Sequence, residues 1–150
     1  MLSVDAIKGA LAVLLLPRLT AENPTIPLEM TAALCVVLGH NFTCWLRFRG
    51  GKGVATSAGV LAALVPVGFL ITLGTFLITL AISRYMSLAS IAGAAVLPFA
   101  VAFTPPGDWR LVLLASLLSV LAIGRHRSNL RRLLAGTERR MGGPKSEAGQ

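Results

Sequence analysis

Charged residues are scarce in this 150-residue sequence and absent from long parts of it. They make up only 13% of the chain, and residues 54–83 form a run of thirty without one. Two further uncharged runs cover residues 85–107 and 111–124. A bilayer core needs about 20 apolar residues per helix, and these runs lack the polar stripe of a helix at the surface of a soluble protein. With a mean hydropathy of +0.75, the sequence excludes a soluble domain and predicts a polytopic membrane protein.

Cysteine and histidine are also rare, with two of each. Cys35 and Cys44 are nine positions apart in one apolar segment, a spacing that matches neither a metal site nor a disulfide framework. We therefore expect no metal ion. The first apolar run is not followed by an A-x-A-like cleavage site, which argues against a removed signal peptide.

Acidic residues are few, six against 14 Lys and Arg, so the net charge is +8. The basic residues flank apolar runs and form no aromatic-interleaved groove, so no nucleic-acid partner is expected. Positive charge beside spans marks the cytoplasmic side and suits anionic lipids or phosphorylated substrates. Seven of the fourteen basic residues follow Gly124 and three lie in residues 47–53. Both regions are predicted to be cytoplasmic.

The fold class predicted is all-α, a transmembrane helix bundle of about six membrane segments with a cytoplasmic juxtamembrane C-terminal helix. Pro17 is expected to close the first segment, and Pro24 and Pro27 to break the chain before the second. Pro66 and Gly68 are expected to close a hairpin, because an even number of crossings must separate two cytoplasmic regions. The segments are residues 4–16, 30–46, 54–64, 67–82, 86–103 and 111–123.

The most informative short motif is Gly50-Gly51-Lys52-Gly53, just before the third segment. Glycines lack a Cβ, so their backbone N–H groups can approach an anion closely. The helix N-terminus that follows suits phosphate, and Arg49 and Lys52 add positive charge. The spacing is not that of a Walker A loop. We interpret the motif as a phosphate-binding loop; the alternative is a flexible basic loop that only anchors topology.

Polar residues at the ends of two other segments are further candidates. His40 is either a packing group or a site residue. Arg84 is isolated in an otherwise uncharged region, where a charge needs an interface or an anionic partner. Ser87 and Ser90 share a helix face at i, i+3. Snorkelling of the arginine and small-residue helix packing are the alternatives.

Beyond the last apolar segment the sequence predicts a helix on the membrane surface, with a leucine stripe beside arginines and an end at Gly136. His126 and Asn129 share one face of it. Histidine can act as acid or base near pH 7, and Asn can orient a hydroxyl or phosphate. A basic helix that binds anionic lipid is the alternative. We expect one domain over residues 1–140 and a disordered cytoplasmic tail over 141–150.

Taken in order, these motifs resemble those of the bacterial acyl-phosphate-dependent glycerol-3-phosphate acyltransferases, the PlsY family. Residues 39–40 and 48–56 resemble its second motif, and residues 84–90 resemble another part of its chain. Asp5 and Lys8 fit the start of its second span. The third motif is matched by His126, Asn129, Arg132, Leu133, Gly136 and Glu138.

The resemblance implies an integral enzyme of the bacterial inner membrane that moves a fatty acyl group from acyl phosphate to the 1-hydroxyl of sn-glycerol 3-phosphate. The products are lysophosphatidic acid and phosphate, and no cofactor is implied. In the family the glycine-rich motif binds the phosphate of glycerol 3-phosphate, which maps onto Gly50, Gly51, Lys52 and Gly53. Anionic membrane lipids are expected as further partners.

The remaining site residues follow from the same resemblance. The catalytic candidates are His126 and Asn129, which match positions important for activity, together with Ser87 and Ser90. Glu138 matches a position held to be structural. The remaining substrate-binding candidates are Arg49, His40 and Arg84.

Two features depart from the family. Thr43 stands where the family usually has proline. The family also has a further span and a first motif ahead of the helix that begins here at residue 5, so the chain alone is expected to have little or no activity. The competing hypothesis is a non-catalytic membrane component, either a small transporter subunit or a lipid-binding remnant. A transporter is expected to contain internal repeats, and the sequence has none.

Overall fold

The computed structural model describes residues 2–20, 25–42 and 51–142, and every regular element in this part of the chain is an α-helix. The predicted all-α fold class is confirmed. The helices are α1 (Leu2–Thr20), α2 (Ile26–Asn41), α3 (Val54–Leu64), α4 (Pro66–Ser83), α5 (Met86–Ala102), α6 (Trp109–Arg125) and α7 (Arg127–Leu134).

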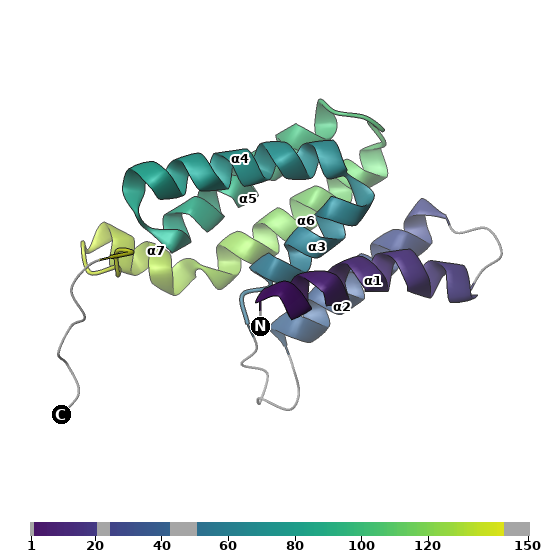
Figure 1. Cartoon of the computed structure of the whole chain (residues 1–150), viewed down its shortest axis with the longest axis horizontal. Helices are drawn as coiled ribbons and strands as arrows, with labels where there is room; N and C mark the ends of the chain where they lie inside the picture. Colours follow the sequence, from purple (N-terminus) through teal and green to yellow (C-terminus); the bar gives the residue numbers. More distant parts are fainter. Residues whose placement is uncertain (1, 21–24, 43–50, 143–150) are drawn as a thin grey trace.

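The helices form two groups that pack against each other. Helix α5 packs between α4 and α6, and α1 packs along α2 and α3 (Figure 1). Contacts of α3 with α4 and of α2 with α6 join the groups. The shared core is formed by apolar side chains from both groups, including Val13, Val60, Val101, Leu114 and Leu118.

Two glycines let α1 and α3 approach closely. A Cβ on Gly9 would overlap the carbonyl oxygen of Thr56, and one on Gly59 would overlap that of Ala6. Small residues at a crossing are the usual means of close helix packing in membranes, where van der Waals contact rather than water exclusion drives association. This close packing fixes the start of α3, which carries the glycine-rich loop.

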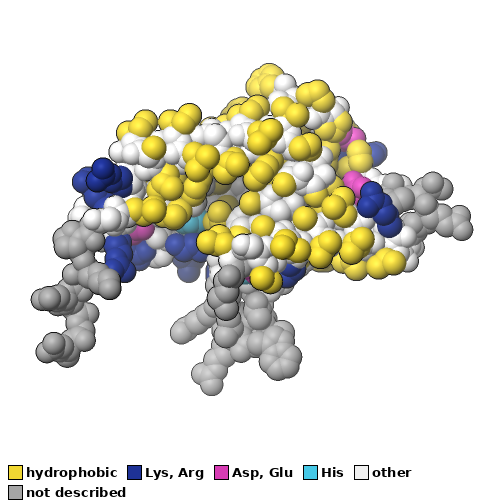
Figure 2. All heavy atoms as spheres, in the orientation of Figure 1, with side chains coloured by type: hydrophobic (Ala, Val, Ile, Leu, Met, Phe, Trp, Pro, Cys, Tyr) yellow, Lys and Arg dark blue, Asp and Glu magenta, His cyan; other side chains and the backbone are white. Residues whose placement is uncertain are grey.

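Apolar side chains cover much of the outer surface (Figure 2). Helix α4 is by itself long and apolar enough to cross a bilayer, and only 6% of it is buried inside the protein. Helices α6 and α7 meet the same criteria together but are bent by 56°. An outward-facing apolar helix suits a lipid environment, whereas the count of six spans stays a prediction.

The roles predicted for two prolines are wrong. Helix α1 continues past Pro17 to Thr20, because the proline removes only one backbone hydrogen bond near the helix end and the Thr20 hydroxyl donates to the carbonyl of Leu16 at 2.9 Å. Pro27 lies in the first turn of α2, where a missing N–H has no intrahelical partner, so it starts the helix instead of breaking the chain.

The predicted break between the third and fourth segments is confirmed. Helix α3 ends at Leu64, the chain turns at Val65, and Pro66 is the first residue of α4. Gly68 is buried against Val101 of α5. The short α3 therefore carries its N-terminal loop back toward the end of the molecule at which α4 ends and α5 begins.

Candidate active site

A cavity of about 830 Å³ collects residues from all three polar groups singled out in the sequence. It lies where the loop before α3, the start of α5, the α6–α7 junction and the segment after α7 meet. Several Lys and Arg side chains gather at this end of the molecule (Figure 2). The polar residues lining the cavity are Asp5, His40, Lys52, Ser87, Ser90, His126, Asn129, Glu138, Arg139 and Arg140.

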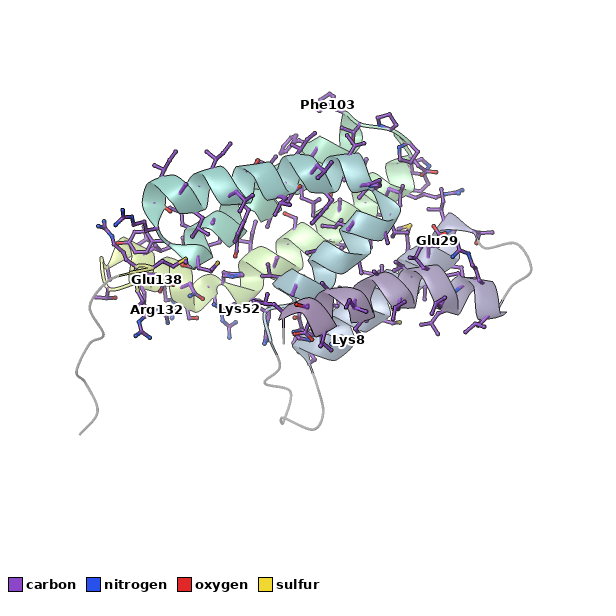
Figure 3. All side chains as sticks on the ribbon, in the orientation of Figure 1. Lys8, Glu29, Lys52, Phe103, Arg132 and Glu138 are labelled. Atoms are coloured by element: carbon purple, nitrogen blue, oxygen red, sulfur yellow. The ribbon has the colours of Figure 1, made fainter. Side chains whose placement is uncertain are left out.

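A chain of hydrogen bonds joins the loop before α3 to the segment after α7. The Lys52 ammonium donates to Asn129 Oδ1 at 2.7 Å, and Asn129 Nδ2 donates to Glu138 Oε1 at 2.6 Å. Ser87 Oγ donates to the same carboxylate oxygen at 2.6 Å, and Arg132 Nε to Glu138 Oε2 at 2.7 Å. Figure 3 shows Arg132 and Glu138 together at one end of the molecule, with Lys52 between them and Lys8. Glu138 is thus the centre of the network.

Glu138 is held as an anion. Burial opposes its ionisation most strongly, but hydrogen bonds from Ser87, Asn129 and Arg132 outweigh burial and lower the pKa of Glu138 to about 2. A carboxylate that accepts several hydrogen bonds is a poor proton donor or acceptor near neutral pH. Its geometry suits the structural role implied by the resemblance.

Lys52 has donors to spare. Burial lowers its pKa, the nearby Glu138 carboxylate raises it, and the Arg132 guanidinium lowers it. An ammonium has three N–H donors, and Asn129 accepts one of them. The other two are available for an anion in the cavity.

His126 is 2% exposed and lies at the bend between α6 and α7. Its Nδ1 is 2.8 Å from the Ala122 carbonyl oxygen. Because a carbonyl only accepts, Nδ1 carries the proton, and the lone pair of the neutral ring is on Nε2. Burial lowers the pKa of His126, Ala122 raises it, Lys52 lowers it and Glu138 raises it. The ring is therefore neutral near pH 7 and can accept a proton.

The described part of the glycine loop requires its glycines. Gly53 has φ of 72°, and a Cβ on it would lie 2.5 Å from Asn41 Oδ1. A Cβ on Gly51 would overlap His40 Nε2. The Gly51 carbonyl accepts a hydrogen bond from Arg125 at 3.0 Å. Arg49 and Gly50, predicted to bind substrate, lie outside the described residues.

His40 is linked to the start of α1. Its Nδ1 is 3.4 Å from Asp5 Oδ1 and 3.2 Å from Lys8 Nζ, and Lys8 donates to Asp5 at 2.9 Å. His40 and Asp5 line the cavity and Lys8 does not. The sequence pointed to each of these residues separately but gave no sign of this cluster.

Two predicted residues are placed differently from the rest. Ser90 lines the cavity but donates to the carbonyl of Met86 on its own helix at 2.9 Å. Arg84 is exposed, does not line the cavity and caps α4 with φ of 59°. Its carbonyl accepts from the Met141 N–H at 2.8 Å. The geometry does not bring the Arg84 side chain to the site.

Sequence reasoning missed the cavity residues beyond Glu138. Arg139, Arg140, Met141 and Gly142 all line the cavity, although a tail was expected from residue 141. The only signal was a Glu-Arg-Arg run between two glycines, and a short polar segment without periodicity does not predict what it packs against.

A smaller apolar cavity of about 280 Å³ adjoins the polar one. Its lining comes from α3, α4, α5 and α6, with Leu2 of α1, and is mostly apolar with no charged residue; the hydroxyl residues in it are Ser57, Thr72, Ser90 and Ser119. Both cavities are lined by Leu2, Val54, Ala55, Phe76 and Ser90. A molecule with a polar head and an apolar tail could occupy both. Within residues 2–20, 25–42 and 51–142, no three His, Cys, Asp or Glu side chains gather closely enough to hold a metal ion.

Known proteins share this sequence pattern. The sequence model of a family described as glycerol-3-phosphate acyltransferase matches residues 1–136. The chain belongs to this family. It is 46% identical to glycerol-3-phosphate acyltransferase 2 of Moorella thermoacetica over 94% of the chain and 70% of the relative. It is 40% identical to the enzyme of Sinorhizobium medicae over 94% of the chain and 66% of that enzyme. The chain thus spans about two thirds of its relatives' length.

Comparison with solved structures points to the same family. The chain is similar to PlsY (YgiH), an integral membrane glycerol 3-phosphate acyltransferase, with a TM-score of 0.83 and 32% identity. The match covers 94% of the chain and 69% of the glycerol 3-phosphate form, and 70% of the lysophosphatidic acid form. The family predicted from the motifs is confirmed, and the chain is an integral membrane member of an acyltransferase family of phospholipid synthesis.

Proposed function

We propose that the cavity binds sn-glycerol 3-phosphate and an acyl phosphate and transfers the acyl group to the 1-hydroxyl of glycerol 3-phosphate. The observation that carries this proposal is the Lys52–Asn129–Glu138 network on the wall of a polar cavity that adjoins an apolar one. The relatives named as glycerol-3-phosphate acyltransferases, and the structures of one with glycerol 3-phosphate and with lysophosphatidic acid, support it.

The glycine loop and Lys52 form the proposed site for the phosphate of glycerol 3-phosphate. Gly53 is the N-cap residue of α3, whose electropositive N-terminus suits a phosphate. The ammonium of Lys52 supplies a full charge. Arg49 and Gly50 are proposed to complete this site, and Asn129 is proposed to orient the substrate beside Lys52. His40, against Gly51, is proposed to hold the loop in place.

The chemistry needs positioning more than activation, because acyl phosphate is already a mixed anhydride. The 1-hydroxyl oxygen attacks the acyl carbonyl carbon, the bond from that carbon to the phosphate oxygen breaks, and phosphate leaves. The hydroxyl proton passes to His126 Nε2 or to a phosphate oxygen. Orientation of two bound reactants and cations near the developing charge supply the rate enhancement. No cofactor enters this scheme.

The apolar cavity is the proposed site of the acyl chain. Its walls contain no charged residue. A hydrocarbon chain that moves from the bilayer into this cavity therefore stays in apolar surroundings. Because α3 to α6 form these walls, the chain would enter from the bilayer while the phosphate stays in the polar cavity. Ser87 and Ser90 would lie near the reacting carbonyl group.

The test is formation of lysophosphatidic acid from acyl phosphate and radiolabelled glycerol 3-phosphate in proteoliposomes. Two proteins are compared: the 150-residue chain, and an extended protein in which the residues of the Moorella thermoacetica relative that lie outside the match are joined to it. The extended protein is expected to form product, and the chain alone much less. Absence of product from both, with the proteins folded, would support a non-catalytic membrane component.

We also propose that the protein lies in a bacterial inner membrane with the cavity on the cytoplasmic side, because positive charge concentrates there. A variant lacking Cys35 and Cys44 receives a single cysteine, either K145C or F103C. A membrane-impermeant thiol reagent applied to intact spheroplasts should label F103C and not K145C. The reverse pattern would overturn this orientation.

A further inference from the structure

The segment after α7 is tied across one side of the polar cavity. Residues 136–142, here called the C-terminal strap, run between Gly136 and Gly142, which have φ of 69° and 75°. Glu138 fastens the strap to Ser87, Asn129 and Arg132, as described above. Arg140 Nε donates to the Tyr85 hydroxyl at 2.9 Å and its guanidinium stacks on the same ring. The contacts of Glu138 and Arg140 therefore hold the backbone of the strap in place on both sides of residue 139.

Arg139 lies between Glu138 and Arg140 but takes no part in the contacts that they make. Arg139 lines the cavity, and its side chain makes no hydrogen bond, ion pair or ring contact with any residue of the described chain. The neighbouring arginines differ, since Arg132 pairs with Glu138 and Arg140 with Tyr85. A cation at a cavity wall without an internal partner is available to an anionic ligand.

The proposed reaction places two phosphate groups in this one cavity. Like charges repel strongly in a site partly shielded from water, so each phosphate needs its own cation. Lys52 lies at the glycine loop, and Asn129 links it to Glu138 on the strap. Glu138 cannot attract a phosphate and is already paired with Arg132. Arg139 follows Glu138 on the strap, lines the cavity and, unlike Arg140, has no partner among the described residues.

We propose that Arg139 binds the phosphate group of the acyl donor, while Lys52 binds that of glycerol 3-phosphate. The guanidinium offers two parallel N–H donors that match two phosphate oxygens. After transfer the same contact would stabilise the departing phosphate. This inference rests on the proposed function, to which it adds a donor-specific residue.

The first experiment measures binding to the 150-residue chain in nanodiscs of zwitterionic lipid. Dodecylphosphonate serves as the probe for the donor, and radiolabelled glycerol 3-phosphate as the probe for the acceptor. The variants are R139Q and R139K, with R131Q as the matched control, because Arg131 is exposed on α7 and does not line the cavity. R139Q removes no internal hydrogen bond, so folding is expected to be unchanged.

R139Q is expected to weaken dodecylphosphonate binding about tenfold or more and to leave glycerol 3-phosphate affinity within about twofold. R139K should fall between R139Q and the parent chain, and R131Q should match the parent chain. In the extended protein, R139Q should raise KM for acyl phosphate and not for glycerol 3-phosphate. Unchanged dodecylphosphonate affinity, or an equal loss for both ligands, would overturn the proposal.

A third measurement distinguishes binding of the acyl donor's phosphate from binding of anionic lipid headgroups in the bilayer. If Arg139 bound only anionic lipid headgroups, R139Q would weaken association with phosphatidylglycerol nanodiscs and leave dodecylphosphonate binding in zwitterionic nanodiscs unchanged, which overturns the proposal. If the parent chain bound neither probe, the proposed function would fail and this inference with it. If the parent chain binds both and R139Q does too, this inference alone fails.

Discussion

Lys52 and Asn129 are 77 positions apart in the sequence and are joined by a hydrogen bond of 2.7 Å in the structure. The bond ties the glycine loop before α3 to α7, and the amide nitrogen of the same Asn129 side chain donates to Glu138 Oε1. A cation, an amide and a carboxylate thus follow one another along one cavity wall. Exchanging the amide and the carboxylate between positions 129 and 138 should preserve the hydrogen bond that joins them. Replacing only one of the two groups should break it.

The variant N129D tests this order. A carboxylate at position 129 would face Glu138 at hydrogen-bond distance, and two carboxylates so close repel each other. We expect N129D to lower the free energy of unfolding by about 2 kcal/mol and the double variant N129D/E138Q to recover most of it, because the new amide can donate. Thermal unfolding in detergent measures both. A double variant less stable than N129D would contradict the network.

The variant G51A tests the role of the glycine loop. A Cβ at this position would overlap His40 Nε2, so the loop must move away from its place at the start of α3. In the extended protein we expect KM for glycerol 3-phosphate to rise about tenfold, more than KM for acyl phosphate. The control is G74A, since no atom lies within 4 Å of a Cβ there. A rise confined to KM for acyl phosphate would assign the loop to the other substrate.

The pH dependence of transfer tests His126. Burial lowers its pKa below the ordinary value of 6.5, so the neutral ring needed to accept a proton persists at pH 6.5 and is lost only as pH falls further. The folded state also binds this proton less readily than the unfolded chain, so stability decreases below pH 6.5. We expect the acid limb of kcat in the extended protein to have its midpoint below 6.5. H126Q should lower kcat and abolish that limb; an unchanged limb would assign it to another group.

Removing either of two buried hydroxyl groups should change the stability of the protein, in opposite directions. Thr56 is fully buried and its Oγ1 has no hydrogen-bond partner among the described residues, whereas Ser119 donates to the carbonyl of Ala94. Removing an unpaired buried hydroxyl relieves a desolvation cost, and removing a paired one loses a hydrogen bond. T56V should therefore raise stability by up to about 1 kcal/mol and S119A lower it by about 1 kcal/mol. Destabilisation by T56V equal to that by S119A would be the contrary result.

Composition alone predicted the helices, because long apolar runs leave few alternatives to a membrane helix. The segment boundaries were less predictable. Pro17 and Pro27 are helix breakers in general, but both lie near helix ends, where a missing N–H has little effect. The turn at Val65 was predictable because Pro66 restricts the residue before it.

The site was predictable where its chemistry is local in sequence. His126 and Asn129 are one helical turn apart, and glycines around Lys52 indicate an anion site by themselves. Contacts between distant segments carried no such signal: nothing in the sequence pairs Arg140 with Tyr85. The isolated charge of Arg84 suggested a ligand, but the backbone there turns into the left-handed region and leaves the side chain exposed.

Binding of radiolabelled glycerol 3-phosphate to the 150-residue chain in nanodiscs tests the central claim most directly. Lys52 lines the cavity, and Arg131, which is exposed on α7 and does not line it, provides the matched control. We predict saturable binding that K52Q weakens about tenfold or more, since a hydrogen bond to a charged group contributes about 1.5–3 kcal/mol. R131Q should leave the affinity within about twofold of that of the parent chain. Equal affinity in the parent chain and K52Q, or no saturable binding at all, would contradict the account.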